Sequence, residues 1–261
     1  MYAGDIVRVA GIDGLLADDA RIDEMRRRLE NGDLYVVEAG VDPELTARIR
    51  DYLGRVARSS LPNYQAIEPH CPNFHRIDRW DERSHVGACV HSFSFFPWNH
   101  DVFGFFGLFA PIYNLKNRIS GLEPSSFLGR TPDRGCIARI SFQYYPKGIG
   151  GLNRHQDPLG YHQITVPSLI MSEKGRDFTE GGLYVETGPG EQVLLDDQCR
   201  PGDVVFFNAA HNHGVARIDP EADPDWLSLE GRWMGLFAVN KLIDNDDIGD
   251  STDLDREETG S

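Results

Sequence analysis

The sequence predicts a mainly β fold with flanking helices, in which a double-sheet barrel of the jelly-roll type occupies the second half of the chain. Two observations support this prediction. Before residue 130, apolar residues recur at helical spacing. After residue 130, short apolar runs follow one another closely with Gly and Pro turns between them, which is typical of jelly rolls. These runs are residues 136–145, 164–171, 182–185 and 203–207.

The first part of the chain alternates helical and extended patterns. Residues 17–29 carry an apolar stripe at helical spacing, and residues 34–37 form a short β-branched and aromatic run. Asp42 and Pro43 are a cap and first-turn pair that begins a second helix. We expect these helices to lie on the outer face of the barrel.

Residues 91–119 are dense in aromatic side chains, and two interpretations are open. They form either a buried helix and loop that pack on the barrel, or a lid over a substrate pocket. We favour the buried role.

The organisation of the chain follows from these patterns. Residues 1–243 are expected to form one catalytic domain, with a helical and mixed part at 1–130 and the barrel core at 131–243. Residues 244–261 hold eight acidic residues and one Arg with almost no apolar residues. We expect this acidic segment to be disordered and to act as a solubilising tail.

Composition narrows the classes of function. A formal net charge of −15 argues against nucleic acid as a partner, because phosphate binding requires a basic face. No stretch has the unbroken apolar length of a membrane span, and no secretory signal pattern begins the chain. The four cysteines form no Cys-x-x-Cys pair, so we expect reduced thiols in a cytoplasmic protein. No pattern bears on the oligomeric state.

One motif carries chemistry. His155 and Asp157 stand two residues apart, so both side chains project from the same face of an extended strand. His213 follows 56 residues later and supplies a third ligand from a distant strand. Two neutral imidazoles and a carboxylate suit Fe(II), and three protein ligands leave three positions for reactants. His211 is an alternative to His213, because the two share a face; we favour His213.

Residues 137–240 resemble the double-stranded β-helix core of the 2-oxoglutarate/Fe(II)-dependent oxygenases, a jelly-roll, cupin-like barrel. The order of that family's sequence signals is kept around the His-x-Asp motif. The signals are Tyr145-Pro146-Lys147-Gly148, Phe178-Thr179-Glu180-Gly181-Gly182-Leu183, Pro201-Gly202-Asp203-Val204-Val205-Phe206-Phe207, His213-Gly214-Val215 and Gly231-Arg232.

The resemblance implies a set of cofactors and a carboxylate anchor. It implies Fe(II) held by His155, Asp157 and His213, with 2-oxoglutarate as cosubstrate and O₂ as oxidant. It also implies that Arg232 pairs with the far carboxylate of 2-oxoglutarate, which a planar guanidinium matches better than Lys does. Arg217 is a rival for this role, because it lies four residues after His213.

The chain departs from the family pattern at Met234, where many members carry a Ser that shares the carboxylate. If the resemblance holds, a hydroxyl from elsewhere must complete the pocket. Tyr144, Tyr145 and Thr165 are the candidates.

The implied activity is hydroxylation of a small polar or amino-acid-like metabolite, with release of succinate and CO₂. Desaturation and ring closure are open alternatives, whereas the carboxylate of Asp157 argues against halogenation. We expect substrate contacts from Arg139, Gln143, His162 and His211. A different interpretation is a cupin-like metal-dependent enzyme or ligand-binding barrel that does not use 2-oxoglutarate. Arg232 discriminates between the two, because a site without 2-oxoglutarate has no particular need for it.

Overall fold

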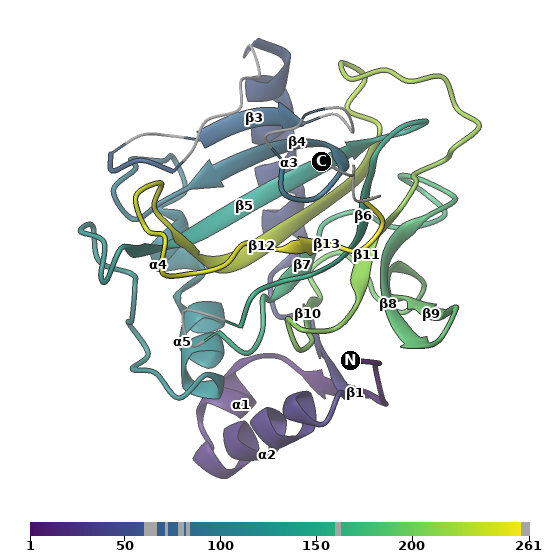
Figure 1. Ribbon diagram of the computed structural model, residues 1–261. Helices are drawn as coiled ribbons and strands as arrows, with labels where there is room; N and C mark the ends of the chain where they lie inside the picture. Colours follow the sequence, from purple (N-terminus) through teal and green to yellow (C-terminus); the bar gives the residue numbers. More distant parts are fainter. Residues whose placement is uncertain (60–66, 71–72, 78–80, 82–83, 160–162, 257–261) are drawn as a thin grey trace, which may run out of the picture.

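The structure is a computed structural model that describes residues 1–59, 67–70, 73–77, 81, 84–159 and 163–256 (Figure 1). Its strands form a curled sheet in the order β1-β2-β10-β7-β12-β5-β4-β6-β11-β8-β9, with β3 paired to β4 and β13 paired to β6. The strands are β1 (Ile6–Ala10), β2 (Leu34–Glu38), β3 (Asn73–Ile77), β4 (Ala88–Phe95), β5 (Cys136–Pro146), β6 (Gly151–Gln156), β7 (Ser168–Ile170), β8 (Gly182–Gly188), β9 (Glu191–Leu194), β10 (Val204–Phe206), β11 (His213–Ala216), β12 (Gly231–Lys241) and β13 (Thr252–Asp253).

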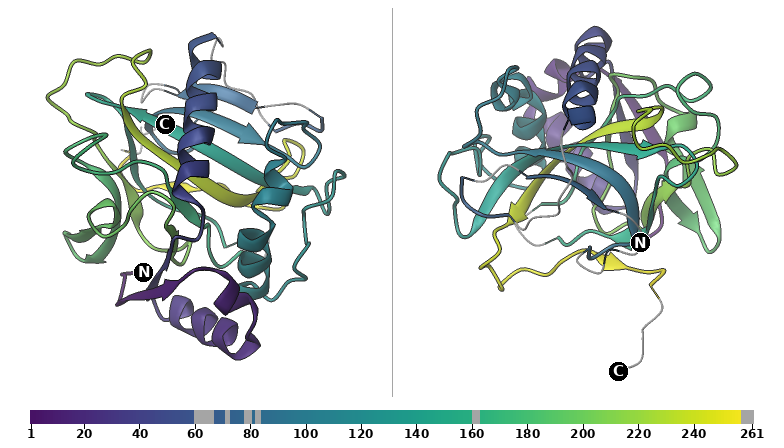
Figure 2. Two further views of the ribbon diagram at one scale, coloured as in Figure 1. Left: turned by 180° about the vertical axis from the view of Figure 1, so that it is seen from behind. Right: turned by 90° about the horizontal axis from the view of Figure 1, so that it is seen from above.

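The helices lie outside this sheet. Helix α3 runs across its back, and α1, α2 and α5 gather at one end of the molecule (Figure 2). The helices are α1 (Asp13–Leu16), α2 (Asp19–Glu30), α3 (Pro43–Ser59), α4 (Phe105–Leu108), α5 (Ala110–Ile119) and the 3₁₀ turn η2 (Leu195–Asp197). Within the described part of the chain, no helix combines the length and the apolar composition that a membrane crossing requires.

Most of the expected elements are present. The four apolar runs after residue 130 become β5, β7, β8 and β10, and the first-half patterns become α2, β2 and α3. Mainly β architecture with flanking helices is therefore confirmed. The N-terminal part contributes more to the sheet than expected, because β2 pairs with β10 and β4 pairs with β5 and β6.

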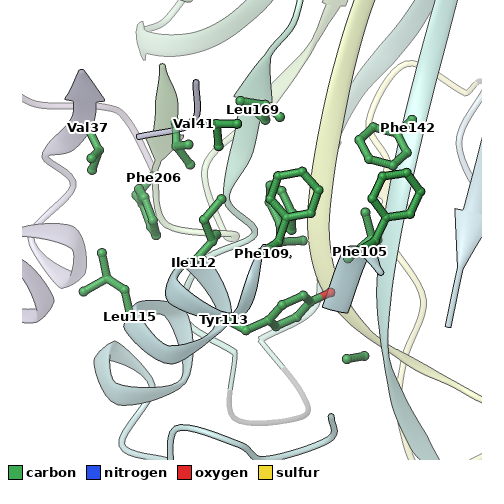
Figure 3. Close-up of a cluster of buried hydrophobic side chains, with 14 of the residues drawn as sticks. Val37, Val41, Phe105, Phe109, Ile112, Tyr113, Leu115, Phe142, Leu169 and Phe206 are labelled. Carbon is green, nitrogen blue, oxygen red and sulfur yellow. The ribbon is translucent and has the colours of Figure 1, made fainter. Parts of the chain in front are cut away.

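Strand β4 corrects the interpretation of the aromatic segment. The first residues of the aromatic segment 91–119, residues 91–95, belong to β4 rather than to a helix or loop, because they pair along β5. Further along the segment, α4 and α5 form. Phe105 of α4 and Phe109 between the two helices are buried against Phe142 of β5, and Tyr113 of α5 packs against Phe237 of β12 (Figure 3). Their rings fill the layer between helices and sheet.

The two largest apolar cores result from the alternation of side chains along the sheet. The larger one lies between the sheet and the helices and includes Phe142 and Tyr144 of β5. The other lies within the curl of the sheet and includes Tyr145 of β5, with Val215 and Met234 from β11 and β12. The face of β5 that carries Tyr145 therefore lines the inside of the barrel.

The C-terminal segment differs from the expectation of a disordered tail. Residues 244–256 are part of the described structure, and Thr252–Asp253 forms β13 beside β6. Acidic composition suggested disorder because it offers little apolar surface to bury. Here backbone pairing and charged partners hold the segment instead, as described below.

Candidate metal centre

Strands β6 and β11 bring three metal-ligating side chains together. His155 lies near the end of β6, Asp157 follows that strand by one residue, and His213 begins β11. The two strands are antiparallel neighbours, and His155 and His213 are partners in their register (Figure 1). Gly214 permits this approach, because a Cβ there would lie 2.8 Å from the Leu152 carbonyl oxygen.

The geometry of the three side chains suits one shared ion. Asp157 Oδ1 lies 3.7 Å from His155 Nε2, and Asp157 Oδ2 lies 3.6 Å from His213 Nε2. One ligand atom from each residue lies within 4.8 Å of the others. These separations fit metal–ligand bonds of about 2 Å converging on one point.

Backbone carbonyls fix both imidazoles. His155 Nδ1 donates to the Asn153 carbonyl, and His213 Nδ1 donates to the His211 carbonyl, each at 2.9 Å. Because a carbonyl only accepts, Nδ1 carries the proton and Nε2 presents a lone pair to the centre. Hydrogen bonds of this kind orient histidine ligands in metalloproteins.

The charge states also favour a metal. Burial, together with the neighbouring His213, lowers the pKa of His155 to about 4. Burial alone would raise the pKa of Asp157, but interactions with His213, His155 and Ser251 outweigh burial and hold it below its ordinary value. At neutral pH the site therefore presents a neutral His155 imidazole and an ionised carboxylate, the forms that bind metals.

The structure distinguishes His213 from His211. The ring of His211 is fully buried beside Phe207, outside the metal-ligating group. Its carbonyl instead orients His213. The expectation that His211 contacts substrate is not met, because it does not line the cavity described next. The expected shared strand face of His211 and His213 is absent, because β11 begins at His213 and His211 precedes it.

A cavity of about 490 Å³ opens beside the metal-ligating group. Its volume lies in the range of small-molecule sites. Arg139, Gln143 and Tyr145 alternate along one face of β5 and line it, as the sequence predicted. Apolar side chains that include Phe207 and Met234 also line it.

Arg232 is fully buried beside this cavity. Its Nε lies 2.9 Å from both oxygens of Asp196, and its Nη1 donates to Met234 Sδ at 2.8 Å. Its guanidinium carbon lies 5.9 Å from the ring centre of Tyr145, which lines the cavity together with Met234. Its Nη2 is buried without a hydrogen-bond partner among the described residues.

The rival arginine has a different setting. Arg217 is exposed, and its Nη2 donates to the Gly148 carbonyl at 2.8 Å. Its guanidinium lies outside the cavity lining formed by the described residues. Arg232 does not line the cavity either, but it is fully buried and contacts Tyr145 and Met234, which do line it, so its burial and contacts favour Arg232 as the anchor for an anionic group.

Two of the three proposed hydroxyl donors do not reach the cavity. Tyr144 lies on the opposite face of β5 from Tyr145, where it stacks on Trp233 and donates to the Glu230 carbonyl. Thr165 is buried next to Asn208 in an isolated bridge and does not line the cavity. Tyr145 lines it and donates to Gln143 Oε1 at 2.7 Å.

His162, which we expected to contact substrate, lies outside the described residues. Several other residues at the site were not anticipated from the sequence. Asp196, which lies in the η2 turn, pairs with Arg232. Ser251 donates a hydrogen bond to Asp157. Neither carries a sequence signal, because each meets its partner only through the tertiary fold. Lys241 and Asp250 also line the cavity.

The comparisons with known proteins agree with this architecture. No protein-family model matches the chain, and the search of curated proteins found no match. Solved structures do match. A prolyl-4-hydroxylase of Pseudomonas putida aligns with a TM-score of 0.52 at 14% identity, over 84% of this chain and 98% of that one.

Two further structures show the same likeness. A full-length protein of Neurospora crassa, solved in complex with alpha-KG, aligns with a TM-score of 0.53 at 10% identity, over 90% of this chain and 85% of that one. The epimerase SnoN, solved with Fe3+, alpha ketoglutarate and nogalamycin RO, aligns with a TM-score of 0.51 at 11% identity, over 91% and 96%. The chain thus has the jelly-roll fold of 2-oxoglutarate/Fe(II) oxygenases.

Proposed function

We propose that the protein is an Fe(II)- and 2-oxoglutarate-dependent oxygenase that hydroxylates a small polar or amino-acid-like metabolite. The observation that carries this proposal is the group of His155, Asp157 and His213 at the wall of an internal cavity. The fold supports it, because the similar structures include a prolyl-4-hydroxylase and an epimerase solved with Fe3+ and alpha ketoglutarate.

The residues present fit both cofactors. Two oriented imidazoles and an ionised carboxylate are a donor set that Fe(II) accepts. The buried Nη2 of Arg232 is a donor available to a carboxylate. Tyr145 is the register partner of Arg232 on the neighbouring strand, so both side chains lie on the same face of the sheet. Bound iron with 2-oxoglutarate and O₂ would supply the oxidising chemistry, ending in succinate, CO₂ and hydroxylated product.

The chain's own side chains perform binding, orientation and exclusion of water. His155, Asp157 and His213 would hold the ion from one side, and Arg232 would hold the far carboxylate of the cosubstrate. Phe207, a buried ring 4.8 Å from the ring of His213, keeps that side of the site apolar. Such shielding protects a reactive site from water and directs it to the bound substrate.

Polar groups elsewhere in the cavity suggest the substrate class. Arg139 and Gln143 line it from β5, and Gln163 lines it from a loop before β7. One guanidinium and two amides suit a compound with a carboxylate and hydrogen-bonding groups, such as an amino-acid-like metabolite. Hydroxylation is the default outcome for such a substrate, because Asp157 occupies the position that halogenases leave open.

We further propose a cytoplasmic location. Cys136 and Cys199 are buried thiols, and burial raises the pKa of Cys136 to about 11 and that of Cys199 to about 12. Buried, protonated thiols are compatible with a reducing compartment.

Anaerobic titration of the apo-protein with Fe(II) and then 2-oxoglutarate tests the proposal. Chelation of the keto acid gives a weak visible charge-transfer band, and we expect it in wild type but not in Asp157→Ala. The matched control is Asp23→Ala, which removes an exposed carboxylate from α2. A folded protein that binds metal without the band would refute 2-oxoglutarate use and favour the cupin-like alternative.

A further inference from the structure

The C-terminal strap, which we define as residues 249–256, lies against the metal-ligating group. We propose that the strap is a wall of the active site and that Ser251 is a positioning residue for Asp157. The inference rests on the proposed function, because it assigns a role toward the metal held by His155, Asp157 and His213.

A single short hydrogen bond links the strap to the site. Ser251 Oγ donates to Asp157 Oδ1 at 2.7 Å, which is the length expected for a hydroxyl bound to an ionised carboxylate. The other oxygen, Oδ2, faces His213 Nε2 at 3.6 Å. The hydroxyl thus engages one carboxylate oxygen and leaves the other directed at the second histidine ligand.

Strand pairing holds the strap on the strand that carries the ligands. In β13, Asp253 is the register partner of His155, and Thr252 is the partner of Gln156. The Leu254 N–H donates to the Arg154 carbonyl at 2.8 Å, which extends this pairing by one residue. Ser251 therefore lies beside Asp157 as the next step of a regular antiparallel register.

Acidic side chains of the strap have specific partners on the barrel. Asp253 accepts from the Gly87 N–H at 2.8 Å and from Asn153 Nδ2 at 3.2 Å. Asp255 accepts from Arg154 Nε at 3.1 Å. Asn153 also supplies the carbonyl that orients His155, so the strap supports both ligands that stand at the end of β6.

The beginning of the strap borders the cavity itself. Gly249, Asp250 and Ser251 are among the residues that line it. Lys241 Nζ donates to Asp250 Oδ2 at 3.0 Å and to the Ile248 carbonyl at 2.7 Å, so the end of β12 holds the entry to the strap. The cavity is therefore bounded on this side by chain that follows the barrel in sequence.

Loss of the Ser251 hydroxyl has a defined expected consequence. Asp157 Oδ1 would lose its donor, and the carboxylate would no longer be held in the orientation that directs Oδ2 at the centre. Removal of a group that orients a metal ligand typically costs about 10- to 100-fold in metal affinity. Because the hydroxyl acts through Asp157, this loss is expected for the metal alone, without cosubstrate.

The test is the Kd for Co(II), measured by anaerobic calorimetry on full-length apo-protein. We expect Ser251→Ala to raise the Kd at least about 10-fold and Ser251→Thr, which retains a hydroxyl, to stay near wild type. The matched control is Ser228→Ala, which removes a hydroxyl that donates to the Asp225 carbonyl at the surface. Its Kd is expected to be unchanged.

Failure of this inference differs from failure of the proposed function. If wild type binds Co(II) and Ser251→Ala binds it equally well, the positioning role is overturned while the metal site stands. If wild type binds no divalent ion, the metal site itself is wrong, and the role of Ser251 falls with it. Thermal unfolding of the apo-proteins serves as a second measurement. Ser251→Ala that weakens Co(II) binding with an unchanged apo Tm supports positioning rather than general stability.

Discussion

The buried ion pair of Arg232 and Asp196 leads to a prediction that separates stability from cosubstrate binding. Their side chains are 0% and 1% exposed, and Arg232 Nε lies 2.9 Å from both carboxylate oxygens. Asp196 Oδ2 also accepts from the Leu183 N–H at 2.6 Å, so the pair joins β12 to β8. Neither charge can be removed alone without leaving the other unpaired and buried.

The cycle consists of Arg232→Met, Asp196→Asn and the double variant. Breaking a buried pair by removing one partner costs about 3–5 kcal/mol, whereas removing both charges together can be close to neutral. We therefore expect each single variant to be less stable than the double variant. The assay is the free energy of unfolding from urea denaturation of the apo-proteins.

Binding of 2-oxoglutarate should follow a different order. Hydrogen bonds to a charged group contribute about 1.5–3 kcal/mol each, so loss of the guanidinium is expected to raise the Kd roughly 10- to 100-fold. Both variants that lack Arg232 should show this loss, although the double variant regains stability. Anaerobic calorimetry with the metal-loaded proteins measures it.

Two results would refute this reasoning. A double variant that binds 2-oxoglutarate as tightly as wild type would show that Arg232 is not the anchor. Single variants as stable as wild type would show that the ion pair contributes nothing to the fold. The first result concerns function and the second structure, so neither can be mistaken for the other.

Three further predictions use matched variants. Lys116, buried with its pKa lowered to about 7 by burial, should make stability rise above pH 7 by up to about 1.4 kcal/mol per pH unit, and Lys116→Met should abolish this rise in urea unfolding. Gly214→Ala should cost about 1–3 kcal/mol and weaken Co(II) binding, unlike Gly107→Ala. Tyr145→Phe should raise the KM for 2-oxoglutarate severalfold, whereas Tyr144→Phe should cost only about 1 kcal/mol of stability.

Each of these predictions has a physical reason and a contradicting result. The folded protein releases the Lys116 proton near pH 7 and the unfolded chain at about 10.4, so the unfolded state binds more protons between them and stability increases with pH; a flat wild-type profile contradicts this. A Cβ at Gly214 would meet the Leu152 carbonyl, whereas one at Gly107 would have nothing within 4 Å; equal unfolding free energies and equal Co(II) Kd values for the two Ala variants would contradict this. Equal KM values for the two Tyr variants would contradict the assignment of faces.

Local periodicity made the metal centre predictable from the sequence. Side chains two apart share a face of a strand, so the spacing alone pairs His155 with Asp157. The same rule placed Arg139, Gln143 and Tyr145 together. The rule also excludes Tyr144, whose nomination as a hydroxyl donor was wrong, because a residue adjacent to Tyr145 must point to the other face.

Long-range contacts explain what the sequence could not predict. Ser251 meets Asp157 across 94 residues of chain, and Asp196 meets Arg232 across 36. The acidic composition of residues 244–261 suggested disorder, since it lacks apolar surface. The composition of this segment does not reveal its partners. Here the backbone groups of β6 pair with those of β13. Partners for the strap's carboxylates likewise exist only once the barrel has formed.

Met234 shows how this site differs from the pattern that it resembles. Many members of the family that the sequence resembles place a Ser hydroxyl there to share the cosubstrate carboxylate, but Met234 Sδ accepts a hydrogen bond from Arg232 Nη1 instead. Asp196 occupies Nε, so Nη2 is the remaining donor that lacks a partner among the described residues. A carboxylate bound here would depend on fewer hydrogen bonds from Arg232. The Tyr145 hydroxyl, which donates to Gln143 Oε1 in this structure, would turn to the carboxylate and carry a larger share. Tyr145→Phe should therefore weaken 2-oxoglutarate binding more than loss of one hydroxyl would in a site that also has the Ser.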